Sequence, residues 1–225
     1  MSTLYLSRLS LRHDASLAAL APLLIPNDSV QQVAAARRLI WAAFADGAER
    51  RRDFLWRQDG KRRWLALSSR LPDDPHQLFE VESKIFAPVL EEGHRLTFVL
   101  RANAVVTRKD EDGRPKRSDI VMDRLRGFPK GERATARGRL ALEAGRDWLA
   151  AQGAKAGFSI DRVEVIAYRM EKIPRDHNKP IELGVLDLEG DITITRPELF
   201  LPTLAAGFGK AKGFGCGLML IKRRR

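Results

Sequence analysis

The chain has 225 residues, with 40 Lys and Arg against 29 Asp and Glu and a formal net charge of +11. This length fits one large domain or two small ones, and a clustered excess of positive charge favours a polyanionic partner, nucleic acid above all. The chain lacks a long apolar run, a secretion-type start and a second cysteine beside Cys216, so we expect a soluble cytoplasmic protein without membrane spans or internal disulfides.

The first part of the chain predicts one compact α/β unit. Strands are indicated by apolar residues with period two, and a helix by apolar residues at spacings of three, four and seven. In chain order we expect a strand at Tyr5–Leu11, a helix at Val30–Phe44 that ends at Asp46-Gly47, a hairpin of Phe54–Trp56 and Trp64–Leu67 around Asp59-Gly60, and a strand at Phe79–Ile85. This order is that of a ferredoxin-like unit.

The order begins again after a predicted boundary at Ala87-Pro88 and Glu91–Gly93. We expect a strand at Leu96–Leu100, a polar loop at Lys109–Arg117, a helix at Arg133–Gln152 stopped by Gly153 and Gly157, strands at Ile160–Met170 and Ile181–Ile194, a short helix at Pro197–Leu204 and a last strand at Leu218–Ile221. The sequence therefore predicts an α+β protein of two tandem ferredoxin-like (βαββαβ) domains, residues 1–88 and 93–225, the first with a reduced second helix.

A glycine-rich loop precedes the last predicted strand. Gly207–Leu218 holds five glycines interleaved with Lys210 and Lys212. A dinucleotide-binding loop follows a strand and opens a helix, and a Walker A loop has Ser or Thr after Gly-Lys, where this chain has Ala211. Both nucleotide interpretations fail on context. The two lysines still favour a phosphate-bearing ligand, whereas any single glycine can simply allow close packing. Phe208 and Phe214 in this loop either pack beneath the glycines or stack on a nucleotide.

Four stretches together resemble the CasE type of CRISPR guide-RNA-processing endoribonuclease, within the repeat-associated RNA-binding superfamily. They are Leu4–Arg8, Arg38–Trp41 with Phe44 and Arg52–Leu55, Phe98–Asn103, and the glycine loop. The resemblance implies a nuclease that binds the hairpin of a CRISPR repeat transcript, cuts it without metal or cofactor through its 2′-hydroxyl, leaves a 2′,3′-cyclic phosphate and retains the product. It also implies partners among the subunits of a Cascade-type effector complex, no membrane, and a monomer outside the complex.

The resemblance also exposes a departure at the catalytic position. The family's usual histidine base falls on Arg37, and a helper tyrosine falls on Ala34. A guanidinium stays protonated and cannot accept a proton, although it can pair with a phosphate oxygen. Three accounts are open: cleavage by positioning and charge alone, a base supplied by His13, Tyr5 or His177, or a subunit that binds its hairpin with little or no cutting. An unrelated ferredoxin-like RNA-binding protein is a further alternative.

Several clusters of cations are candidates for contact with RNA, since an A-form stem is recognised mainly through phosphates and 2′-hydroxyls. The candidates are Arg169, Lys172, Arg175, His177 and Lys179 on the second hairpin, which the resemblance places in the major groove of the stem; Arg108, Lys109, Arg114, Lys116 and Arg117 in the polar loop; Lys210 and Lys212 in the glycine loop; Arg38 and Arg101 in the matched stretches; and a basic tail, Lys222–Arg225.

Overall fold

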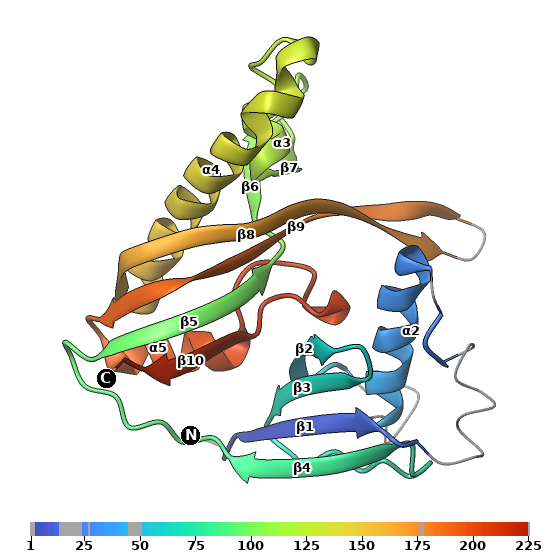
Figure 1. Cartoon of the computed structure of the whole chain (residues 1–225). Coiled ribbons are helices and arrows are strands. Elements are labelled where there is room, and N and C mark those ends of the chain that lie inside the picture. Colours follow the sequence, from blue (N-terminus) through green and yellow to red (C-terminus); the bar gives the residue numbers. More distant parts are fainter. Residues whose placement is uncertain (1–2, 14–23, 27, 45–50, 176–177, 225) are drawn as a thin grey trace.

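A computed structural model describes residues 3–13, 24–26, 28–44, 51–175 and 178–224, with the side chains of 29, 30, 175 and 178 excepted. It contains two four-stranded antiparallel sheets (Figure 1). The first has the order β2-β3-β1-β4, with β1 Tyr5–Leu11, β2 Phe54–Gly60, β3 Arg63–Ser68 and β4 Phe79–Ile85. The second has the order β10-β5-β9-β8, with β5 Arg95–Ala102, β8 Phe158–Arg175, β9 Asn178–Ile194 and β10 Met219–Arg223. In each sheet the order is last, first, third and second strand, which confirms the tandem ferredoxin-like fold.

The core of the first unit forms between its sheet and α2, Ser29–Ala42. Alternate residues of β1, among them Leu9 and Leu11, are buried against Ile40 and Phe44, and the Phe44 and Phe54 rings stack with centroids 4.4 Å apart. Residues 69–78, between β3 and β4, contain no helix, in agreement with the predicted reduction. The expected helix stop at Asp46-Gly47 lies outside the described residues.

In the second unit, α4, Arg133–Ala156, and α5, Pro197–Ala206, pack on the sheet. Leu140, Ala144 and Leu149 are buried as the helical period predicts, while Trp148 is half-buried. The helix ends at Gly157, whose φ is +77°, and not at Gly153. Gly153 is instead buried inside the helix, where a Cβ would lie 2.5 Å from the Phe158 carbonyl oxygen. Its role is therefore close packing and not termination.

The stretch predicted as a polar loop is a β-hairpin, which corrects that expectation. Strands β6, Val105–Lys109, and β7, Pro115–Asp119, pair antiparallel and lead into α3, Ile120–Leu125, which the sequence did not indicate. The turn is stabilised by the Asp110 carboxylate, which accepts backbone N–H groups from Asp112 and Arg114. The hairpin is held by backbone pairing and by this turn. Its sequence therefore lacks the alternation of apolar residues from which a strand is predicted.

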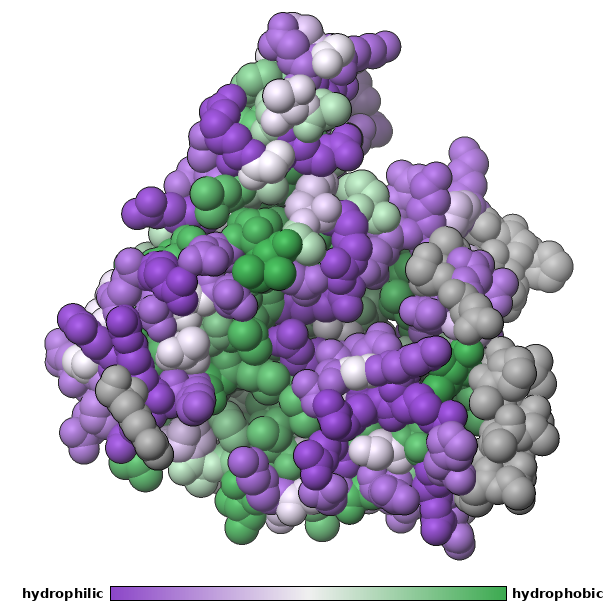
Figure 2. Space-filling view, in the orientation of Figure 1, coloured by the Kyte–Doolittle hydropathy of each residue, from purple (hydrophilic) through white to green (hydrophobic). Residues whose placement is uncertain are grey.

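The hairpin, α3 and the first turns of α4 form a projecting arm, residues 105–139 (Figure 1). Figure 2 shows mainly hydrophilic residues over the arm, whereas apolar residues gather between the two sheets. There Leu55, Leu67 and Leu218 form a small buried cluster that joins the two units. No helix within the described ranges has both the length and the apolar character that a bilayer crossing requires. Because β4 ends at Ile85 and β5 begins at Arg95, we keep residues 1–88 and 93–225 as the proposed domain bounds.

Gly157 and Gly138 provide a matched test of the α4 C-terminus. Gly157→Ala forces a left-handed residue and a Cβ 2.3 Å from the Arg196 carbonyl oxygen, so we expect a loss of unfolding free energy greater than about 1 kcal/mol. Gly138 is exposed within α4 with no atom within 4 Å, so Gly138→Ala should stabilise by about 0.5–1 kcal/mol. Urea unfolding measures both changes in unfolding free energy. Effects of the same sign would contradict the roles of Gly157 as the left-handed cap and of Gly138 as an exposed helix position.

Candidate functional site

The glycine loop is fixed to the second sheet by backbone contacts. The Lys210 N–H donates to the Asn103 carbonyl at 3.0 Å, and the Gly217 N–H donates to the Arg101 carbonyl of β5 at 2.7 Å. Within the loop, the Phe208 N–H donates to the Gly217 carbonyl at 2.9 Å. Gly209 has a φ of +72°, and a Cβ there would lie 2.7 Å from the Asn103 carbonyl oxygen. Phe208 belongs to the core of the second unit, so it packs and does not face a nucleotide. The loop is therefore a rigid structure and not a flexible connection.

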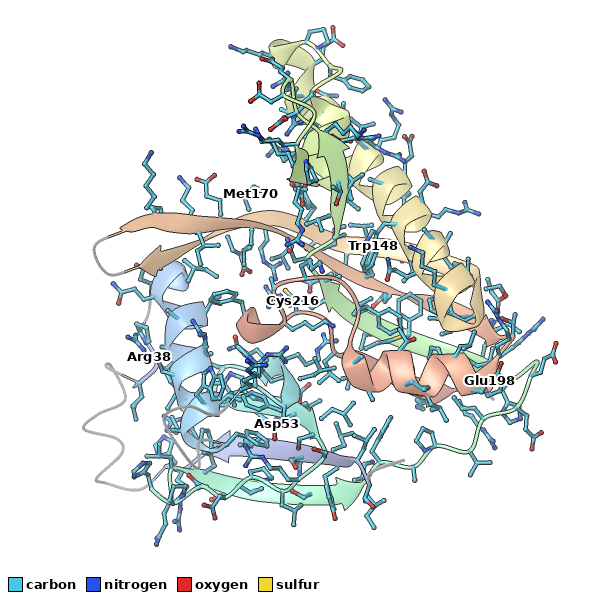
Figure 3. All side chains as sticks on the ribbon, turned by 180° about the vertical axis from the view of Figure 1, so that it is seen from behind. Arg38, Asp53, Trp148, Met170, Glu198 and Cys216 are labelled. Carbon is cyan, nitrogen blue, oxygen red and sulfur yellow. The ribbon has the colours of Figure 1, made fainter. Side chains whose placement is uncertain are left out.

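The same loop crosses to the first unit. Its 3₁₀ turn, Lys212–Phe214, contacts α2 and β2, and the Arg37 guanidinium lies 5.1 Å from the centre of the Phe214 ring. A Cβ on Gly215 would lie 3.1 Å from the Trp56 ring. Figure 3 shows this loop, marked by Cys216, beside the helix that carries Arg38. A cation over an aromatic face contributes about 0.5–1 kcal/mol at an exposed site, enough to orient a flexible arginine.

Positive charge converges where the loop meets the first unit. The half-buried Lys212 donates from Nζ to the Ala206 carbonyl at 2.6 Å, and its pKa is lowered by burial and by the nearby Arg52 and Lys210. Burial also lowers the pKa of Arg52. Among the described residues, no carboxylate forms an ion pair with Arg37, Lys210 or Lys212. We call Arg37, Arg52, Lys210, Lys212 and Phe214 the loop–helix site. The charge of the nearby Asp53 favours the charged form of Arg52, whereas Arg37, Lys210 and Lys212 are the cations suited to a phosphate.

The two further candidate bases do not come together at this site. Tyr5 starts β1, opposite Ser68 and Ile85, and is half-buried, whereas His13 is exposed just past the other end of that strand. At about 3.3 Å per residue the two lie on the order of 25 Å apart. At most one of them can therefore share a phosphate with Arg37, and their catalytic roles stay predictions. His177 lies outside the described residues.

Two predicted RNA contacts, Arg101 on β5 and Arg169 on β8, are already engaged in ion pairs with carboxylates of the β8–β9 hairpin. Arg101 lies 2.5 Å from Glu171, and Arg169 lies 2.8 Å from Asp187 and 3.2 Å from Glu171. Lys172 is exposed and 3.5 Å from Glu182, and Lys179 is exposed. The side chain of Arg175 is outside the description. The cations nearer the tip of this hairpin are thus the more available ones.

The arm carries a second group of exposed cations. Arg108 pairs with Asp123 at 2.9 Å, which raises the arginine pKa, and Arg114 is 3.8 Å from Asp112. The remaining predicted contacts of the hairpin are exposed: Lys109, Lys116 and Arg117. A polar groove runs along this hairpin; its lining includes Arg108, Lys109, Lys116, Ser118 and Arg126.

The predicted basic tail is largely part of the second sheet. Lys222 and Arg223 belong to β10, and the Arg224 N–H donates to the Arg95 carbonyl while its guanidinium lies 3.4 Å from Asp191. Arg225 is outside the described residues.

Sequence reasoning missed two arginines of the first unit. Arg52 reaches the loop–helix site, and Arg57 crosses between the units to donate to the Val99 carbonyl at 3.2 Å. Burial is the main cause that lowers the pKa of Arg57. Arg52 stands inside a matched stretch, which was the one available signal, whereas nothing in the sequence indicates that Arg57 reaches the other unit.

Comparisons with known proteins place these features in context. A family model described as CRISPR associated protein matches residues 4–223. The structure is similar to the CRISPR endoribonuclease Cse3 bound to a 19-nt RNA, with 23% identity, 99% of each chain covered and a TM-score of 0.68. It is also similar to Thermus thermophilus Cse3 bound to an RNA representing a pre-cleavage complex, with 23% identity, 98% and 99% coverage and a TM-score of 0.67. For Cas6e from Escherichia coli K-12 the values are 20% identity, 98% and 100% coverage and 0.64. A search of curated sequences gave no significant match. These likenesses establish the fold.

Cys216 provides a test of how tightly the glycine loop is packed. The thiol is buried beside the ion pairs of Arg101 and Asp187, and burial, as the largest effect, raises its pKa to about 12. Since the thiolate is the reactive form, we expect no alkylation by iodoacetamide in the native protein at pH 8 and rapid alkylation after denaturation. Mass spectrometry of the intact chain measures both. Rapid labelling without denaturant would mean that the loop opens in solution.

Proposed function

We propose, from the premise that this chain belongs to the CRISPR-associated protein family, that it binds the hairpin of a CRISPR repeat transcript and cleaves it. The observation that carries the proposal is the loop–helix site, where Arg37 of the first unit and Lys210 and Lys212 of the second meet with no described carboxylate in an ion pair with them. It stands on a tandem ferredoxin-like framework similar to that of Cse3 and Cas6e. A folded RNA supplies the phosphate that such a site lacks.

The proposed reaction uses the RNA as its own nucleophile. The 2′-hydroxyl oxygen attacks the adjacent phosphorus, the bond from phosphorus to the 5′-oxygen breaks, and the products are a 2′,3′-cyclic phosphate and a 5′-hydroxyl. The role of Arg37 is to bind a nonbridging oxygen as negative charge grows there, with Phe214 holding the guanidinium in place. The bound product stays with the protein, which we place in the cytoplasm as a monomer that joins the other subunits of a CRISPR effector complex.

The other RNA-contacting surfaces are part of the same proposal. Exposed cations on the β8–β9 hairpin, the arm and the glycine loop lie at separate places, so they can contact different phosphates of one stem. The second candidate function, a hairpin-binding subunit that does not cut, is favoured by one observation, the arginine at the position of the usual base.

Cleavage by the purified protein tests this proposal. With labelled repeat RNA in EDTA we expect a single cut with a cyclic phosphate end, and no cut when the nucleotide before the scissile bond is 2′-deoxy. Arg37→Ala should lower the single-turnover rate by about 10²-fold through loss of charge stabilisation. Arg63→Ala is the control, because this arginine already pairs with Asp59 in the β2–β3 turn. Tight binding by wild-type protein without any cut would instead support the binding-only candidate.

The salt dependence of hairpin affinity tests the surface. If about six to eight cations neutralise phosphates, the slope of log K against log salt concentration should be about −4 to −7. Fluorescence anisotropy measures this slope over about 50 to 300 mM salt, a range that includes the physiological ionic strength of about 0.15 M. A nearly flat response would contradict a phosphate-binding surface made of these residues.

A further inference from the structure

The proposed nuclease needs a proton acceptor, and the described part of the chain offers one in an unexpected place. Arg37 cannot act as a base. The segment that contacts the helix of Arg37 is the glycine loop, and Lys212 stands two residues before Phe214, the ring under the Arg37 guanidinium. At about 2 Å of rise per residue, the 3₁₀ turn keeps the backbones of Lys212 and Phe214 within a few ångströms.

We propose that Lys212 is the general base of the cleavage reaction, taking the proton of the attacking 2′-hydroxyl on Nζ. This inference rests on the proposed nuclease function. Two residues from different units then share the catalytic work. Arg37 on α2 stabilises the charge that grows on the phosphate, and Lys212 in the glycine loop accepts the proton of the 2′-hydroxyl.

The surroundings of Lys212 favour the neutral amine that a base requires. Burial is the largest cause that lowers its pKa, and the cations Arg52, from the segment before β2, and Lys210, from the same loop, lower it further. Arg37 of α2 reaches the same 3₁₀ turn through its contact with the Phe214 ring. Within the described ranges, no carboxylate forms an ion pair with Lys212 that would favour its charged form. When RNA binds, Arg37 neutralises the phosphate charge that would otherwise favour the ammonium form.

The hydrogen bond from Nζ to the Ala206 carbonyl is compatible with this role. A neutral amine still has two N–H groups, so one can donate to Ala206 while the lone pair remains free. In the reaction, the lone pair takes the 2′-hydroxyl proton as the oxygen–phosphorus bond forms. The departing 5′-oxygen takes a proton from water, and the hydroxide so formed takes the proton from the Lys212 ammonium, which restores the amine.

Substitution of Lys212 by arginine and by methionine separates proton transfer from charge. Lys212→Arg keeps the cation and a donor toward Ala206 but has no lone pair, and Lys212→Met keeps the alkyl stem that packs against Gly217. We expect both variants to cleave about 10²- to 10⁴-fold more slowly in single turnover, with the hairpin affinity of Lys212→Arg within a few-fold of wild type. Lys84→Met, exposed on β4, is the control.

The pH profile gives a readout that a structural role would not change. The wild-type rate should rise tenfold per pH unit and level off below the ordinary lysine pKa of about 10.4, because the neutral amine is the active form. Lys212→Arg should lose this rise after subtraction of RNA hydrolysis without protein.

The outcomes separate the two proposals. Cleavage by Lys212→Arg at the wild-type rate overturns the role of Lys212 and leaves the nuclease function standing. A flat wild-type profile between about pH 5 and 8, where proteins are usually most stable, does the same. A wild-type protein that binds the hairpin without cutting it overturns both. If Lys212→Met fails to fold, Lys212→Arg and the wild-type profile still decide.

Discussion

The glycine loop packs against the first unit at positions that leave no room for a side chain. A Cβ on Gly207 would lie 2.8 Å from Leu55, and one on Gly215 would meet the Trp56 ring. The loop can approach β2 and α2 this closely because these positions lack side chains. Close packing and phosphate binding are therefore not alternative explanations of the glycines: packing brings Lys212 and Phe214 to α2, and the cations that result are the phosphate site.

The net charge of the chain overstates the charge available to a ligand. Arg101 of β5 and Arg169 of β8 share Glu171 and Asp187 within the β8–β9 ladder, where the side chains of Arg101 and Glu171 are only 19% and 15% exposed. Breaking such a half-buried pair leaves a charge without compensation, so the network stiffens the hairpin and does not offer its cations to RNA. Available charge is concentrated at the hairpin tip, the arm and the loop–helix site.

Sequence patterns predicted the strands of the two sheets well where burial alternates along the strand, as in β1 and β5. Alternation in β1 and the helical period in α2 follow directly from which side chains meet the core. The arm was missed because its hairpin is held by backbone pairing and by Asp110, neither of which produces an apolar period. Gly153 was taken for a helix stop because a glycine at a packed position and one at a left-handed cap look alike in sequence. The environment of Lys212 was equally hidden, since one of the charges that lowers its pKa is Arg52, 160 residues earlier in the sequence.

The division of the site between the units has a mechanistic consequence. In a site built on one helix, the group that stabilises charge and the group that moves the proton keep their relative position whatever the second unit does. Here Arg37 belongs to the first unit and the glycine loop to the second, and the Phe214–Arg37 contact and the leucine cluster around Leu218 set their separation. Small changes at this interface alter the alignment of the reacting groups more than they alter phosphate binding by cations on separate surfaces. Chemistry is therefore more sensitive to the interface than affinity is, because proton transfer requires hydrogen-bond distance whereas charge attraction falls slowly with separation.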